Sequence, residues 1–277
     1  MDFLEWVMEI EKQKRFDSVF DEYAISLGLN GYVVTDESWY QSEIQCPYSR
    51  LYYVIDGSGS FVYGGREMKI EPGYVYFAPC GASYGFYGTP AVEKLFFHIN
   101  ITKPDGYDLF ASPDMRISRF KCDTEQIKRL LALYRSDDPV KLLLLKAEIW
   151  KTVMEFASEM LIFDSTRKQY SETVEAAILY IRENISASLK SSCVADAVFC
   201  SVSSLTERFK KEMGTSVAKY IDDMLMFEAC KMLASDNKTI GEISTALGYC
   251  DQFYFSRRFA KRFSITPRDY RKRCAES

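Results

Sequence analysis

Four side chains near the C-terminal end of the sequence have types and spacing that suit contacts with base edges. Gln252, Phe253, Ser256 and Arg257 fall on one face of a predicted helix. Arginine can donate two hydrogen bonds to guanine, glutamine fits adenine, and a phenylalanine ring can contact the methyl group of thymine. This face is therefore predicted to read duplex DNA in the major groove.

The residues that follow are strongly basic. From 257 to 273 the chain has eight basic residues and a single acid, Asp269. Such a cluster suits phosphate groups, whose neutralisation supplies much of the affinity for DNA. Arg258 and Lys261 are included among the predicted DNA-binding residues for this reason.

Two short helices must position these side chains. The first has one apolar face, formed by Ile240, Ile243, Ala246 and Leu247. Gly248 interrupts it, as glycine does where the backbone needs a positive φ. The second spans about 251–262, with Phe255 and Phe259 four residues apart on the inward face. A helix, a tight turn and a second helix with polar residues outward is a helix-turn-helix arrangement.

A weaker copy of this pattern lies about 50 residues earlier, within 185–220. Leu205 aligns with Phe255, and the turn at 198–201 has no glycine. The outward and basic positions of this copy are Ser203, Ser204, Thr206, Glu207, Arg208, Lys210 and Lys211. Glu207 stands where the second copy has Arg257, so small hydroxyl groups are predicted to read bases here. Arg208, Lys210 and Lys211 are candidate phosphate contacts.

The duplication favours DNA binding over an ordinary three-helix core. A predicted helix over 217–233 joins the copies, so two recognition helices can enter successive major grooves about 34 Å apart. Charge agrees with this division. Residues 171–277 hold 16 basic and 14 acidic residues, whereas residues 1–170 hold 19 and 25. The acidic first part is not expected to touch nucleic acid.

Composition excludes several other classes of protein. No apolar run approaches the roughly 20 residues needed to span a bilayer, and acids interrupt the first residues, so a cytoplasmic location is predicted. The eight cysteines form no close pair and are expected to be buried free thiols.

In the first part of the chain the spacing of apolar residues changes from a helical period to a period of two. After a predicted helix within 1–30, short β-branched and aromatic segments from 32 to 101 alternate with Gly and Pro, which indicates about seven strands in a sandwich or small barrel. Gly64-Gly65 predicts a two-residue hairpin. Helical periodicity returns over 124–163, where Leu143 and Leu144 widen the apolar face. This pair of helices packs on its own sheet or on a second subunit, with neither alternative favoured. The polar stretch 164–172 is predicted to be a linker.

The C-terminal part resembles the DNA-binding domain of the AraC/XylS family of transcriptional regulators. The matching segments are YIRENI, LTERFKKEMGTS and ISTALGYCDQFYFSRRFAKRFSITPRDYR. The first part is similar to the cupin-like sensor of that family through LYYVIDGSGSFVYGG, IEPGYVYFAP and LFFHI. Leu225, Ser244 and Ser264 depart from the family pattern.

The resemblance implies an α+β multidomain fold. Residues 1–163 would form a cupin-like β-barrel with a helical pair, for ligand sensing and dimerisation. Residues 164–174 would be the linker, and 175–277 an all-α domain of two helix-turn-helix units joined by a linker helix.

Strand alternation places Lys94, Phe96 and His98 on one face. The resemblance turns this face inward beside Tyr84, with Glu43 and Arg50 near the mouth. A sugar or other small polar ligand would suit these groups, although the aromatic rings also fit simple packing. Cupin-type enzymes hold a metal with several histidines, and this chain has only His98. Cys46, Cys80 and Cys122 lack ligand spacing, so no catalytic residue, metal or cofactor is predicted.

The sequence therefore predicts a ligand-sensing transcriptional activator or repressor that is not an enzyme. The partners implied are double-stranded DNA, a small-molecule effector, RNA polymerase and a second copy of the chain, with no membrane. A ligand-independent interaction adaptor and a metal-dependent cupin enzyme are the alternatives.

Overall fold

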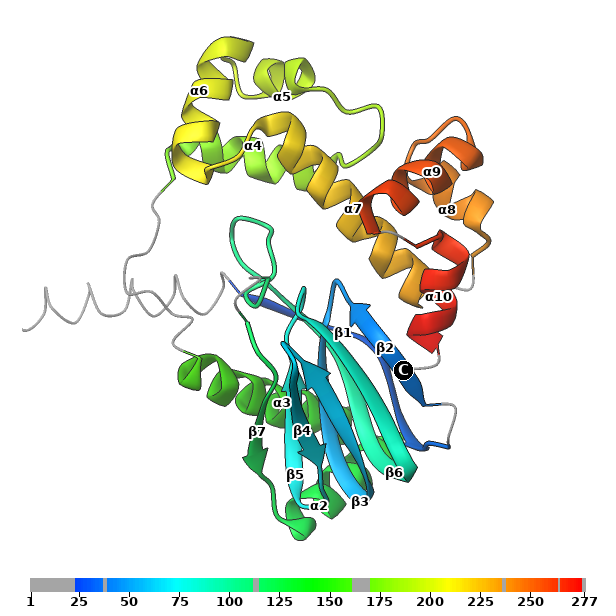
Figure 1. Cartoon of the computed structure of the whole chain (residues 1–277). Coiled ribbons are helices and arrows are strands. Elements are labelled where there is room, and N and C mark those ends of the chain that lie inside the picture. The colour runs from blue at the N-terminus through cyan, green and yellow to red at the C-terminus, as the bar shows by residue number, and fades with distance from the viewer. Residues whose placement is uncertain are drawn as a thin grey trace, which may run out of the picture.

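The structure is a computed structural model that describes residues 23–36, 39–111, 115–160, 170–235, 238–263 and 265–275. Most of the helix predicted at the N-terminal end lies outside these ranges. The described part has a sheet-rich first portion and an all-helical second portion, as predicted (Figure 1).

The described strands form one antiparallel sheet (Figure 1). Their bounds are β1 Ala24–Val34, β2 Tyr40–Gln45, β3 Ser49–Tyr63, β4 Arg66–Ile70, β5 Tyr74–Ala78, β6 Ser83–Thr102 and β7 Ser118–Lys121. The order is β1-β6-β3-β5-β7, with β2 also paired to β6 and β4 to β3. The two longest strands, β3 and β6, lie side by side and organise the rest.

The long strands differ from the prediction in one respect. The glycine-containing segments 57–59 and 88–90 do not end strands but lie inside β3 and β6. The register of β3 on β6 shifts between Gly57 and Gly59. Gly57 has φ +87°, and a Cβ there would lie 2.1 Å from the carbonyl oxygen of Ala91. Glycine is needed here for close approach of two backbones, which bends the pair without breaking it.

Two further strands were not predicted. Residues 24–30 lie in the range 1–30, within which a helix was predicted, but they belong to β1, whose side chains alternate between exposed and half-buried positions. The short strand β7 was not predicted, because four residues carry too little periodicity to be recognised. It pairs with β5 and is the last strand on that side of the sheet.

Different helices pack on the two faces of the sheet. The outer face, with Leu51, Tyr53 and Phe97, packs on helices α2 (Thr124–Tyr134) and α3 (Pro139–Glu159). Side chains from α3 that complete this core include Ile149 and Phe156. The inner face, with Tyr52, Val54 and Phe96, shares one continuous apolar cluster with the C-terminal helices.

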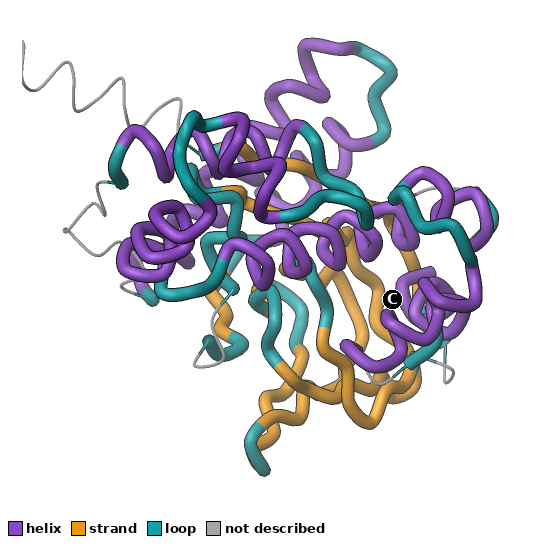
Figure 2. Tube along the Cα trace, turned by 90° about the horizontal axis from the view of Figure 1, so that it is seen from above, coloured by secondary structure: helices purple, strands orange, loops and turns teal. Residues whose placement is uncertain are grey.

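The helical part has the predicted order of helices. Its members are α4 Glu172–Glu183, α5 Ser191–Ala197, α6 Val202–Met213, α7 Val217–Ser235, α8 Ile240–Ala246, α9 Gln252–Phe263 and α10 Pro267–Ala275. Helix α7 runs from the α4–α6 group to the α8–α10 group above the sheet (Figure 1). Seen from above, strands emerge from beneath the helices (Figure 2). The domain bounds drawn from the sequence stay a prediction.

Each helix-turn-helix unit has one residue with positive φ in its turn. Gly248 has φ +77° between α8 and α9, and Phe199 has φ +54° between α5 and α6. Phe199 is 96% exposed, so its ring contributes nothing to the core that would offset this backbone strain. The glycine-free turn predicted at 198–201 is confirmed, at the cost of an unusual conformation for phenylalanine.

We expect Gly57→Ala and Gly64→Ala to separate backbone strain from crowding. Both residues have positive φ, but a Cβ at Gly64 would meet nothing within 4 Å. Gly64→Ala should lower the free energy of unfolding by about 1–2 kcal/mol. Gly57→Ala should lower it by about 2–5 kcal/mol, because the carbonyl of Ala91 must also shift. Urea unfolding followed by tryptophan fluorescence measures both, and equal losses would contradict the close approach of β3 and β6.

Candidate nucleic-acid interface and inner-face cluster

Helix α9 presents a polar and aromatic face to solvent. Asp251 precedes the helix, and its carboxylate accepts hydrogen bonds from the backbone N–H groups of Phe253 and Tyr254, at 3.0 and 2.9 Å. Phe255 and Phe259 are fully buried on the opposite side. The predicted base-reading residues Gln252, Phe253 and Arg257 are exposed, and Ser256 is half-buried.

Helix α6 repeats this arrangement in the first unit. Leu205 and Phe209 are fully buried. Ser203, Thr206, Glu207, Lys210 and Lys211 are exposed, and Ser204 is half-buried. The hydroxyl of Thr206 donates to the carbonyl of Val202 at 2.7 Å, so its oxygen keeps only acceptor capacity for another partner.

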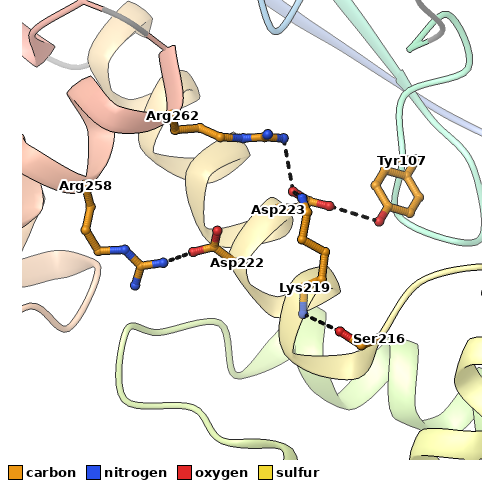
Figure 3. A network of polar contacts seen from close by, with 7 residues as sticks. All are labelled: Tyr107, Ser216, Lys219, Asp222, Asp223, Arg258 and Arg262. Atoms are coloured by element: carbon orange, nitrogen blue, oxygen red, sulfur yellow. Dashed lines mark hydrogen bonds and ion pairs between the residues drawn. The ribbon is translucent and has the colours of Figure 1, made fainter.

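Arginines at equivalent positions of the two units both contact a neighbouring helix of the helical part. Arg258 forms an ion pair with Asp222 of α7, and Arg262 forms one with Asp223 at 3.1 Å (Figure 3). Arg208, which aligns with Arg258, donates to the hydroxyl of Thr173 in α4 at 3.4 Å. These arginines turn toward their own domain, whereas Arg257, Lys210, Lys211 and Lys261 extend into solvent. Arg208 and Arg258 are thus placed to hold α6 and α9 in position.

A second group of predicted site residues lies on the inner face of the sheet. In the antiparallel pairing of β3 with β6, Arg50 lies opposite His98, Tyr52 opposite Phe96, and Val54 opposite Lys94. Arg50, Lys94 and His98 are all buried, with at most 2% of their surface exposed. Tyr84 is buried nearby, and the guanidinium of Arg50 lies 6.0 Å from its ring centroid.

The charged groups of this inner-face cluster (Arg50, Lys94 and His98) influence one another. Burial lowers the pKa of Lys94 well below its ordinary value, and the charge of Arg50 lowers it further. Burial likewise lowers the pKa of His98, with contributions from Arg50 and Lys94. The other predicted residue, Glu43, is exposed and accepts a hydrogen bond from the Ser83 hydroxyl at 2.6 Å. The structure does not bring Glu43 into the cluster.

Three aromatic residues that contact Lys94 or His98 were not predicted. Tyr48 stacks on His98 with 4.3 Å between ring centroids, and Trp39 and Tyr52 lie against Lys94. Tyr48 and Tyr52 share the alternation of Arg50, so extending the period of two to β3 would have found them. Trp39 precedes β2, and nothing in its sequence neighbourhood indicates its place.

Three hydrogen bonds join the sheet portion of the chain to the C-terminal helices. Tyr48 donates to the Sγ of Cys274 in α10 at 3.1 Å. Tyr220 of α7 donates to the backbone carbonyl of Asp105, in the loop after β6, at 2.7 Å. Tyr107 of the same loop donates to Asp223 at 3.4 Å (Figure 3). Asp223 thus contacts the sheet portion and Arg262 of α9 at once.

Cysteine placement agrees with the prediction in part. All eight cysteines are free. Those that are buried are Cys46, Cys80, Cys122, Cys230 and Cys274, whereas Cys193 and Cys250 are exposed. Within the described ranges no three His, Cys, Asp or Glu side chains lie close enough to hold a metal ion. No helix in the described part is long and apolar enough to cross a membrane.

Comparison with known proteins assigns the helical part to a class. Residues 194–273 match the model of a helix-turn-helix domain family. The lactose operon transcription activator of Staphylococcus xylosus is 23% identical over 235 residues, which cover 80% of this chain and 83% of that protein. The xylose operon regulatory protein of Escherichia coli K12 is 37% identical over 95 residues, which are 34% of this chain and 24% of that protein.

The fold of most of the chain also has a counterpart among solved structures. A crystal structure of apo ToxT from Vibrio cholerae covers 90% of this chain and 97% of its own, with a TM-score of 0.50 and 12% sequence identity. Residues 194–273 are therefore a helix-turn-helix domain, and the fold of most of the chain is similar to that of ToxT. The chain is similar to transcriptional regulators of the AraC/XylS family.

We expect Arg258→Ala and Lys261→Ala to weaken DNA binding in different ways. Lys261 is exposed, so losing a phosphate contact should reduce the slope of log K against log salt by about 1. Arg258 is held by Asp222, so its loss should lower affinity by misplacing α9 and leave the slope nearly unchanged. Fluorescence anisotropy on a labelled duplex at several salt concentrations measures both. A slope change for Arg258→Ala as large as that for Lys261→Ala would make it a direct phosphate contact.

Proposed function

We propose that this regulator binds duplex DNA through α6 and α9 and responds to a small polar molecule bound at the inner-face cluster. The observation that carries the proposal is the pair of equivalent helices, α6 and α9, each with a buried apolar side and an exposed polar side. The domain division at residues 163 and 175 is part of the proposal. Control of transcription through RNA polymerase is inferred from the activators among the relatives.

The contacts between sheet and helices give the cluster a route to the DNA-binding helices. Tyr48 stacks on His98 and donates a hydrogen bond to Cys274 of α10. A ligand that moves the ring of Tyr48 or His98 therefore disturbs the contact of α10 with the sheet portion. The loop after β6 contacts Tyr220 and Asp223 of α7, and Asp223 also pairs with Arg262. A ligand with different affinity for two arrangements of these contacts shifts their populations.

An exposed apolar stripe on α3 supports a homodimer. Val140, Leu142, Leu143 and Leu144 are exposed on this helix, while Leu145 and Ile149 pack on the sheet. The stripe is contiguous along the first turns of the helix, unlike scattered single leucines on a monomer surface. A second copy of the same helix offers a matching face.

Arg257→Ala tests the reading of bases. In a binding-site selection with the purified full chain, the variant should lose preference at one base pair, worth about 1–3 kcal/mol, because Arg257 is exposed on α9. Lys211→Ala is the matched control, since an exposed phosphate contact should weaken all sequences alike. An unchanged preference in Arg257→Ala would refute its role, and no salt-dependent duplex binding at all would favour an interaction adaptor.

Leu143→Lys tests the dimer. Leu143 is 66% exposed, so a charge there should leave the fold intact and separate the copies by desolvation and repulsion across the symmetric interface. Sedimentation equilibrium should report a dimer for the unaltered chain and a monomer for the variant. Leu179→Lys alters a leucine of α4 that is 56% exposed and should leave the dimer unchanged. A monomer in all three samples would contradict the proposed α3 interface.

A further inference from the structure

The exposed side of α6 carries an acid at its centre. Leu205 and Phe209 are fully buried on one side of this helix. Glu207 lies midway between them in the sequence, which places it on the opposite side of the helix, and it is exposed. Arg257 occupies the equivalent place on α9 and is also exposed. The two recognition helices therefore present opposite charges at the same position.

Nothing within the helix accounts for an acid at this place. Acids stabilise the first turn of a helix through its dipole, but Glu207 lies in the middle of α6. Lys210 and Lys211 follow at the spacing at which acids and bases pair along a helix. Other helices of this protein have such ion pairs, namely Glu125–Lys128, Lys151–Glu155, Lys219–Asp223 and Glu228–Lys231. The carboxylate of Glu207 forms neither an ion pair nor a hydrogen bond with any residue that the structure describes, so it is available to a partner outside the chain.

The groups beside Glu207 also accept hydrogen bonds rather than donate them to an outside partner. The hydroxyl of Thr206 donates its proton to a backbone carbonyl one turn earlier, at 2.7 Å, so its oxygen can only accept from another group. Arg208 donates to the hydroxyl of Thr173 in α4 at 3.4 Å. An ionised carboxylate only accepts, whereas a guanidinium such as that of Arg257 only donates. The centres of α6 and α9 thus have opposite hydrogen-bonding character.

Base edges in the major groove differ in the same respect. Cytosine presents its N4 amino group, guanine presents the acceptors O6 and N7, and thymine presents the acceptor O4. A carboxylate accepts a hydrogen bond from the amino group of cytosine and is repelled by the acceptors of guanine and thymine. Adenine presents an amino group beside an acceptor, which suits an amide better than a carboxylate. The carboxylate of Glu207 therefore matches cytosine.

The local charge permits α6 to approach DNA despite this acid. From 207 to 211 the chain holds three basic residues and one acid. Lys210 and Lys211 are exposed in the last turn of α6, where they can contact phosphates. Phosphates repel an unpaired carboxylate, so Glu207 gains from the complex only where a base donates to it. Glu207 would therefore contribute specificity rather than affinity.

We infer that Glu207 makes the first helix-turn-helix unit a reader of the amino group of cytosine. This inference rests on the proposed function, because it names the base that α6 reads in duplex DNA. The second unit would read guanine through Arg257. A site of this kind fixes the direction in which the chain lies on the duplex, because the reversed chain would place Glu207 against the acceptors of guanine.

The inference extends to DNA that is methylated on this amino group. In a duplex, one amino hydrogen of cytosine pairs with guanine and the other faces the major groove. A methyl group on N4 takes the place of the hydrogen that faces the groove, so the donor is lost and carbon lies against the carboxylate. Binding should therefore weaken when the cytosine read by α6 is N4-methylcytosine.

A binding-site selection with the purified full chain supplies the first test. The half-site of α6 is the one whose preference survives in Arg257→Ala, and there the unaltered chain should select cytosine at one base pair. Glu207→Gln should change this preference to adenine, because an amide pairs with N6 and N7 of adenine. Glu207→Ala should select no base there. Lys211→Ala is the matched control, since the loss of an exposed phosphate contact weakens all sequences alike and keeps the cytosine.

The second test changes the DNA instead of the protein. Duplexes with cytosine or N4-methylcytosine at the selected base pair are titrated by fluorescence anisotropy at fixed salt concentration. The unaltered chain and Lys211→Ala should bind the methylated duplex about tenfold more weakly. Glu207→Ala should bind both duplexes equally to within about twofold, which isolates the contact between carboxylate and amino group. The comparison on the unaltered chain does not depend on the folding of any variant.

Three results would overturn the inference. They are the selection of no cytosine in the half-site of α6, an unchanged cytosine preference in Glu207→Ala, and equal binding of both duplexes by the unaltered chain. After any of these, a preference in the other half-site that depends on Arg257 would leave the proposed function standing. If the unaltered chain binds no duplex at any salt concentration, the proposed function fails and this inference fails with it.

Discussion

The packing of helix α7 is the constraint on which the rest of the structure depends. Its first half buries Tyr220, Ile221 and Met224 with helices α4 to α6. Its second half buries Leu225, Met226, Ala229, Cys230 and Leu233 in the cluster that also holds the inner face of the sheet. One helix therefore sets the spacing of the two helix-turn-helix units and packs its second half on the inner face of the sheet. Acids on its remaining surface, Asp222 and Asp223, fix the orientation of α9 through Arg258 and Arg262.

Local sequence patterns predicted the elements of the helical part well. The apolar spacing of Phe255 and Phe259 and the break at Gly248 depend on neighbours within a few residues, so the sequence shows them directly. The roles of Arg208 and Arg258 could not be predicted in this way. Each side chain has charge and partial exposure that suit a phosphate, and only the fold reveals that Thr173 and Asp222 lie beside them.

The sheet was harder to predict because its decisive contacts join distant segments. Alternation placed Lys94, Phe96 and His98 on one face, and the structure confirms this register. Arg50 was expected at the mouth, but it is fully buried against His98, which becomes visible only when β3 and β6 are paired. Glycines at 57 and 59 suggested a break, because sequence alone does not distinguish a turn from two backbones in close contact.

The hydrogen bond from Tyr220 to Asp105 has a consequence for exchanging parts between related regulators. It is accepted by a backbone carbonyl, so many residue types could stand at position 105 without loss of the bond. The adjacent Gly106 has no such freedom, since it has φ +82° and a Cβ there would lie 2.5 Å from the Tyr220 hydroxyl. A chimera that joins this helical part to a foreign sheet would need the loop's length and its glycine, together with Tyr107, whose hydroxyl donates to Asp223. The loop is in this sense a component of the helical part, although the chain places it between two strands.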